Sequence, residues 1–206
     1  MKVATLVFPG VEELDFVGFL EVLAVANRLR GERYFETELV GTEAGPIECS
    51  GGLRVVPDVD LRDIGEYDLL FVPGGGANRK TGVDALMDNR LVLGTLRRAY
   101  DGGKMVWSVC TGALLLARAG ILEGRAATTH HAFHDDLKKS GAKVRKARVV
   151  TDGSITTGGG ISSSIDVGLE LVRKTLGREA AKKAGERIEY PPPRGKIQTN
   201  LLLSNC

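Results

Sequence analysis

Three absences narrow the class of protein before any motif is considered. The 206 residues include three cysteines, Cys49, Cys110 and Cys206, an odd number without the spacing of a disulfide framework. Such a chain fits a reducing cytoplasm. No apolar stretch approaches the length of a membrane-spanning helix, and the first residues lack the pattern of a secretory signal. We therefore expect a cytoplasmic protein with no membrane partner.

The chain also has no excess of charge of one sign. Lys and Arg number 28 against 26 Asp and Glu, which gives a formal net charge of +2. A nucleic-acid partner is therefore not expected. The densest group of cations lies between Lys138 and Arg148, and we interpret it as a solvated face.

Histidine is scarce as well, which limits the metal sites that the chain could form. The three histidines are His130, His131 and His134, of which the first and last are four residues apart. This run lacks the glutamate of a metalloprotease motif, and no second ligand cluster accompanies it. We predict no metal and no cofactor. His130 follows an expected strand and could lie near Cys110, whereas His131 and His134 have the pattern of surface residues.

Strand-like and helix-like segments alternate along the chain. Apolar runs predict strands over residues 3–8, 35–40, 67–72 and 126–129 and into Cys110, and Asp152-Gly153 predicts a hairpin over 148–157. Helices are expected over residues 13–29, 83–100, 162–176 and 179–188, and after Cys110 and His130. In the first helix, Leu14, Val17, Val22, Val25 and Leu29 fall on one face. The alternation predicts an α/β fold with a mostly parallel sheet and right-handed crossovers.

No repeat, linker or low-complexity segment divides the chain, so a single domain over residues 1–190 is the simplest interpretation. Pro191-Pro192-Pro193 is expected to end regular structure, because proline removes a backbone donor and fixes φ. Residues 191–206 are then a C-terminal tail.

The stretch from Lys104 to Ala117 carries the strongest sign of chemistry. An apolar run ends at Cys110, small residues form a turn, and an Ala/Leu-rich segment follows. This is the layout of a nucleophile elbow, with cysteine in place of the serine of hydrolases. A thiol at a helix N-terminus is expected to ionise more easily than a free one. The alternative is a buried, inert cysteine.

Two further segments are expected at the same edge of the sheet. Gly74-Gly75-Gly76 follows a strand, and its backbone N–H groups could face a developing oxyanion. A phosphate loop is disfavoured because Arg79 occupies the position of its second glycine, and a tight turn without chemistry is the other alternative. Asp15, in the apolar start of the first helix, could exchange a proton with Cys110, its pKa raised by burial, or could simply begin the helix.

In combination these segments resemble the ThiJ/PfpI superfamily, which has the class I glutamine amidotransferase-like fold. The matching segments are Phe8–Asp15, Phe71–Gly76, Ser108–Ala113, Ala127–His130 and Thr156–Ser162, followed by Ile165-Asp166. Cys-Thr-Gly at Cys110 is similar to the isonitrile hydratase-like branch and to the amidase-like domain of AraC-type regulators. Thr111 departs from the histidine that follows the cysteine in the protease-like branch.

The resemblance implies a flavodoxin-like three-layer sandwich, a homodimer and a role for each site residue. Cys110 would be the nucleophile, Asp15 the general acid/base and Thr111 a catalytic neighbour. The oxyanion and substrate-binding residues would be Gly75, Gly76, Thr111 and His130.

The implied function is that of a cofactor-free cysteine enzyme acting on a small molecule. The leading hypothesis is hydration of an isonitrile to an N-substituted formamide. The alternatives are a glyoxalase-, deglycase- or amidase-like enzyme, a redox sensor in which Cys110 is oxidised, and a ligand-sensing domain. The residue pattern does not select among them, because a fold does not fix a substrate.

Overall fold

The computed structural model describes residues 1–76, 81–190 and 198–199, and within them the central sheet has eight strands. Their order is β12-β10-β11-β7-β6-β1-β2-β5, and every neighbouring pair is parallel except β10 and β11. The strands are β1 (Lys2–Val7), β2 (Glu36–Gly41), β5 (Val59–Asp60), β6 (Leu69–Val72), β7 (Met105–Ser108), β10 (Val149–Asp152), β11 (Ile155–Gly158) and β12 (Gln198–Thr199). The predicted mostly parallel sheet is confirmed.

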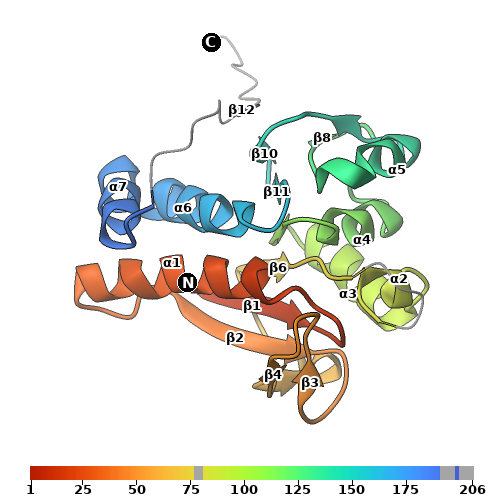
Figure 1. Ribbon diagram of the computed structural model, residues 1–206, viewed down its shortest axis with the longest axis horizontal. Coiled ribbons are helices and arrows are strands. Elements are labelled where there is room, and N and C mark those ends of the chain that lie inside the picture. The colour runs from red at the N-terminus through yellow and green to blue at the C-terminus, as the bar shows by residue number, and fades with distance from the viewer. Residues whose placement is uncertain (77–80, 191–197, 200–206) are drawn as a thin grey trace.

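Helices cover both faces of this sheet and complete three layers. Helices α1 (Glu13–Arg30), α6 (Ser163–Leu176) and α7 (Arg178–Arg187) pack together on one face and lie at the left of Figure 1. Helices α2 (Val83–Leu86), α3 (Arg90–Asp101), α4 (Gly112–Arg118) and α5 (His134–Lys139) lie at the right. The arrangement is the expected flavodoxin-like α/β sandwich.

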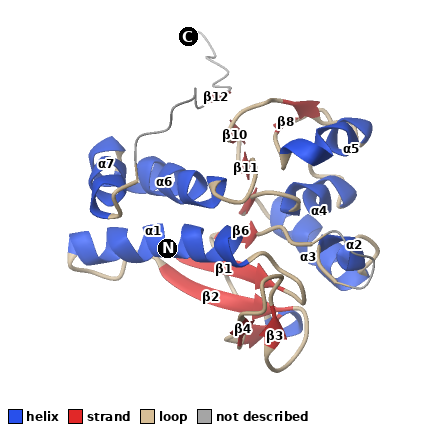
Figure 2. Cartoon of the chain, in the orientation of Figure 1, coloured by secondary structure: helices blue, strands red, loops and turns tan. Residues whose placement is uncertain are grey.

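Short strands and turns lie outside the central sheet, and some of the short strands are visible in Figure 2. They are the ribbon of β3 (Ile47–Glu48) and β4 (Arg54–Val55), the parallel pair β8 (Ala126–Ala127) and β9 (Lys143–Val144), and the 3-10 turns η1 (Leu61–Asp63) and η2 (His131–Phe133). The η2 turn and α5 follow β8 directly.

Alternation along the strands divides the core into two clusters. Val3, Leu69 and Phe71 pack on the face of α1 and α6, whereas Ala4 and Leu70 pack on the opposite face. Phe71 stacks on Phe19 of α1, with ring centroids 3.9 Å apart and planes 11° apart. Strands that are buried on both faces explain why the sequence shows continuous apolar runs rather than alternating polar and apolar residues.

Two sequence-based boundaries are wrong for local reasons. The helix expected over residues 83–100 is two helices, because the Asn89 side chain accepts hydrogen bonds from Leu91 and Val92 N–H and so begins α3 afresh. The strand expected over 126–129 is limited to β8, which pairs with β9 in a separate two-stranded sheet.

The buried face of α1 also differs from the expected one. Leu14, Val17 and Leu29 are 41%, 43% and 48% exposed, and Phe16 and Phe19 enter the core instead. The expectation for the C-terminal segment is wrong in part, since Gln198–Thr199 forms β12 beside β10. The rest of the expected tail lies outside the described residues.

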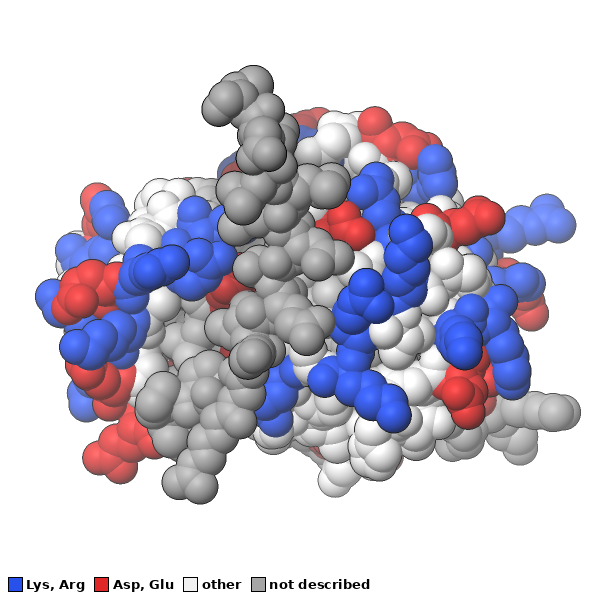
Figure 3. All heavy atoms as spheres, turned by 90° about the horizontal axis from the view of Figure 1, so that it is seen from above, with Lys and Arg blue, Asp and Glu red and all other residues white. Residues whose placement is uncertain are grey.

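The surface carries charges of both signs. Seen from above, Lys and Arg occur together with Asp and Glu (Figure 3). Most of the basic group is exposed, as expected, but Arg148 is half-buried and pairs with the buried Asp166. Within the described residues, no helix is long and apolar enough to cross a membrane.

We expect Phe71→Ala to lower the free energy of unfolding by about 3–5 kcal/mol, because it leaves a cavity beneath α1. Urea unfolding followed by circular dichroism measures the change. Leu53→Ala is the control, because Leu53 is 48% exposed and its truncation creates no buried cavity. Equal losses in the two variants would contradict this description of the core.

Candidate active site

Three loops meet at the carboxyl edge of the sheet, where β1, β6 and β7 end. The loop after β1 is tied to the loop after β6, because Glu12 N–H donates to the Gly74 carbonyl at 3.0 Å and Val11 bridges to Gly75. The loop after β7 joins them when Val109 N–H donates to the Val72 carbonyl at 3.1 Å. Parallel strands thus bring together residues that are far apart in sequence.

Cys110 occupies the sharp turn between β7 and α4. Its φ is 55°, in the left-handed region that a non-glycine residue rarely adopts. Its N–H donates to the Gly159 carbonyl at 2.7 Å and to the Gly158 carbonyl at 3.2 Å, and its carbonyl accepts the Thr129 hydroxyl at 2.7 Å. Neighbours on both sides therefore hold the strained conformation. The expected nucleophile elbow stays a prediction.

Asp15 enters the same edge from the first turn of α1 and is fully buried. Its Oδ2 accepts the Gly74 N–H at 2.7 Å. A Cβ at position 74 would lie 2.6 Å from the Thr111 hydroxyl oxygen and 2.9 Å from the Asp15 Oδ2. Gly74 is therefore needed for Asp15 and the turn at Thr111 to approach each other.

Burial keeps protons on both Asp15 and Cys110. Burial raises the pKa of Asp15 from 3.8 to about 8, against the Gly74 N–H and the Cys110 side chain, which lower it. Burial first and the Asp15 charge second raise the pKa of the Cys110 thiol to about 12. The predicted rise for Asp15 is confirmed. The predicted easier ionisation of Cys110 is wrong for this structure, because burial outweighs the N-terminus of a seven-residue helix.

Thr111 links the cysteine to the glycine turn. Its hydroxyl accepts the Gly75 N–H and donates to the Gly75 carbonyl, both at 3.1 Å. The Gly76 N–H donates to the Gly10 carbonyl at 3.1 Å. Both glycine amides expected to face an oxyanion therefore have other acceptors here, whereas the Thr111 N–H interacts with the Cys110 side chain and lowers its pKa.

His130 is half-buried beside the cysteine turn. A Cβ at Gly160 would be 3.0 Å from the His130 Cδ2, so the ring rests against the loop that holds the Cys110 N–H. Its Nδ1 accepts the Ala132 N–H at 3.3 Å. Burial, then the charges of His131 and His134, lower the pKa of His130, so the ring is mainly neutral at pH 7. Among the described residues, no group of three or more ligands is placed to hold a metal ion.

Cys110, Thr111 and His130 meet at a small pocket of about 200 Å³, whereas the fully buried Asp15 is not among its lining residues. It is lined by Glu12, Gly75, Gly76, Cys110, Thr111, His130, Phe133 and Ile161. Sequence reasoning missed Glu12, Phe133 and Ile161 as lining residues. Phe133 stands three residues after His130 on a helical turn, a spacing that could have indicated it.

Comparisons with known proteins identify the family of the chain. The model of the DJ-1/PfpI family matches residues 1–174. The chain belongs to the DJ-1/PfpI family. It is 37% identical over 192 residues to isonitrile hydratase of Pseudomonas putida, covering 93% of this chain and 79% of that protein.

Two further members of the family are similar over most of the chain. Protein DJ-1alpha of Drosophila melanogaster is 30% identical over 183 residues, covering 87% of this chain and 80% of that protein. The crystal structure of a ThiJ/PfpI family protein from Pseudomonas syringae superimposes with a TM-score of 0.81 at 29% identity, covering 94% of this chain and 76% of that one. The predicted superfamily is confirmed.

We expect the stability advantage of Asp15→Asn over the wild type to grow as the pH rises from about 4 to 8. The raised pKa of Asp15 means that the folded state binds a proton which the unfolded state releases in this range, so wild-type stability falls as the pH rises. Asparagine can still accept the Gly74 N–H but does not titrate. Urea unfolding of both proteins at several pH values measures the difference, and a constant difference would contradict the raised pKa.

Proposed function

We propose that the protein is a cysteine-dependent enzyme that hydrates a small isonitrile to an N-substituted formamide without a cofactor. The observation that carries the proposal is the pair of proton-bearing groups, Asp15 and Cys110, at one edge of the sheet. An isonitrile carbon must receive both a nucleophile and a proton. The similarity to the isonitrile hydratase of Pseudomonas putida supports this choice.

The first step adds the thiol S–H across the isonitrile carbon. The Cys110 sulfur bonds to that carbon, Asp15 delivers its proton there, and the thiol proton returns to Asp15. The product is a thioimidate in which the carbon is bonded to sulfur, hydrogen and nitrogen. The Thr111 N–H lies beside the sulfur and stabilises the negative charge that develops at the reacting atoms.

Water completes the reaction. Its oxygen bonds to the thioimidate carbon while one of its protons passes to the nitrogen. The C–S bond then breaks, and the sulfur leaves with the electron pair and takes the second proton of the water. The released product is the N-substituted formamide. Because the Nδ1 of a neutral His130 accepts the Ala132 N–H, its Nε2 carries the proton and can donate a hydrogen bond to the oxygen of the attacking water, while Gly75 and Gly76 shape the pocket. The homodimer and the cytoplasmic location expected from the sequence stay predictions.

We expect Cys110→Ala to abolish turnover of methyl isonitrile and Asp15→Asn to lower kcat about a hundredfold, the usual worth of a positioned acid. Formamide production followed by NMR measures both. Glu21→Gln is the matched control: Glu21 lies on the same helix, is exposed and pairs with Arg28. Its turnover should equal that of the wild type.

Two outcomes would contradict the proposal. A wild type that converts methylglyoxal to lactate but no isonitrile would move the protein to the glyoxalase alternative. Full activity in Asp15→Asn would remove Asp15 as the acid and make His130 the next residue to test.

A further inference from the structure

A second hollow lies next to the reaction pocket. It measures about 490 Å³ and is formed by α2, α4 and the segment from η2 to the end of α5. Its lining is Asp84, Met87, Leu114, Ala117, Arg118, Phe133, Asp136 and Ser140. Phe133 also lines the reaction pocket, so its ring forms part of the wall between the two spaces.

The residues that line this second hollow, called the groove from here on, fall into two sets that differ in solvent exposure. The residues that are buried or half-buried are all apolar: Met87, Leu114, Ala117 and Phe133. The polar residues are all exposed, and Arg118 pairs with Asp88 at 2.6 Å while Asp136 pairs with Lys139 at 3.2 Å. The interior of the groove therefore favours an apolar group.

The size of the reaction pocket limits the length of the substrate that it can hold. Pockets for small ligands usually measure about 300–1,000 Å³, whereas the space above Cys110 is about 200 Å³. Adding the neighbouring groove brings the volume within that range. The reaction pocket suffices for an isonitrile as small as methyl isonitrile, and a long substituent would extend into the second space.

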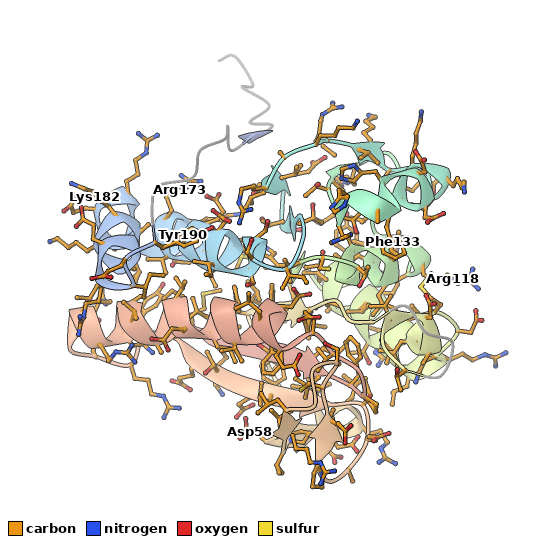
Figure 4. The ribbon with its side chains drawn as sticks, in the orientation of Figure 1. Asp58, Arg118, Phe133, Arg173, Lys182 and Tyr190 are labelled. Atoms are coloured by element: carbon orange, nitrogen blue, oxygen red, sulfur yellow. The ribbon has the colours of Figure 1, made fainter. Side chains whose placement is uncertain are left out.

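Phe133 lies where it can control access between the reaction pocket and the groove. It stands at the end of the short turn η2, half-buried, with its ring edge toward His130 at a centroid distance of 6.1 Å. Figure 4 shows it on the side of the molecule where Arg118 lies, far from Tyr190 and Arg173. Leu114 and Ala117 follow Cys110 along α4 and present one face, three residues apart, to the groove.

We propose that the groove between α2, α4 and α5 is a subsite for the substituent of the substrate, and that it takes an apolar chain that passes Phe133. The identity of the reacting group rests on the function proposed above, whereas the groove can be tested without it. Ala117→Leu fills the groove, and leucine is nearly as good a helix former as alanine. Phe133→Ala opens the wall.

The test compares alkylation of Cys110 by iodoacetamide and by N-hexyl iodoacetamide. In both reactions the Cys110 thiolate bonds to the methylene carbon, iodide leaves with the electron pair, and the thiol proton goes to solvent. Peptide mass spectrometry separates Cys110 from Cys49 and Cys206. The measured quantity is the ratio of the hexyl rate to the unsubstituted rate, which cancels any change in the reactivity of the thiol itself.

We expect Ala117→Leu to lower this ratio at least about fivefold, because the hexyl chain loses buried methylene contacts. Phe133→Ala should raise the ratio. Ala180→Leu on α7, away from the groove, is the control and should keep the wild-type ratio. An unchanged ratio in Ala117→Leu overturns the proposal, whatever Phe133→Ala does.

The same variants are then assayed with methyl and hexyl isonitrile. A lower hexyl-to-methyl ratio of kcat/KM in Ala117→Leu supports the subsite during turnover. If no isonitrile reacts with any of the proteins, the proposed function fails, while the alkylation ratios still decide whether the groove binds the chain.

Discussion

The approach of Asp15 and Thr111 to the two sides of Gly74 is the constraint on which the rest of the site depends. The Gly74 N–H donates to Asp15 at 2.7 Å, and a Cβ on residue 74 would lie within 3 Å of both neighbours. A side chain here would separate α1 from the turn after β7. The sheet then would no longer place an acid beside the cysteine.

This close packing also determines the protonation of the site. Burial is the first cause of the raised pKa of both Asp15 and Cys110, and the charge of Asp15 adds to the second. The site therefore keeps the nucleophile Cys110 as a thiol and the acid Asp15 as a carboxylic acid, rather than as a thiolate and a carboxylate. Such a pair suits a reaction in which sulfur and a proton are added to one carbon.

The sequence predicts the features that depend on local patterns. Local patterns correctly predicted the strand that leads into Cys110, the hairpin at Asp152-Gly153 and the alternation of strands and helices. They could do so because periodicity and turn preference depend on residues that are close in sequence. The break between α2 and α3 was missed although Asn89 is a local cap. A continuous helical pattern concealed it.

Features that depend on tertiary packing could not be predicted from local sequence patterns. The pKa of Cys110 depends on burial by segments that are distant in sequence, and the N–H of Gly75 has an acceptor on Thr111, 36 residues away. The groove behind Phe133 exists only where α2, α4 and α5 meet. Its residues show no motif, because each one satisfies the ordinary pattern of its own helix.

Asp15 and Cys110 are electrostatically coupled, and titration of the thiol tests this coupling most directly. The Cys110 thiolate is measured as the difference in ultraviolet absorbance between a protein and its Cys110→Ala form, over a range of pH. We expect a wild-type pKa well above 9 that falls in Asp15→Asn, since the carboxylate charge is removed while burial stays. An Asp15→Asn pKa equal to or above that of the wild type would contradict the coupling and the mechanism built on it.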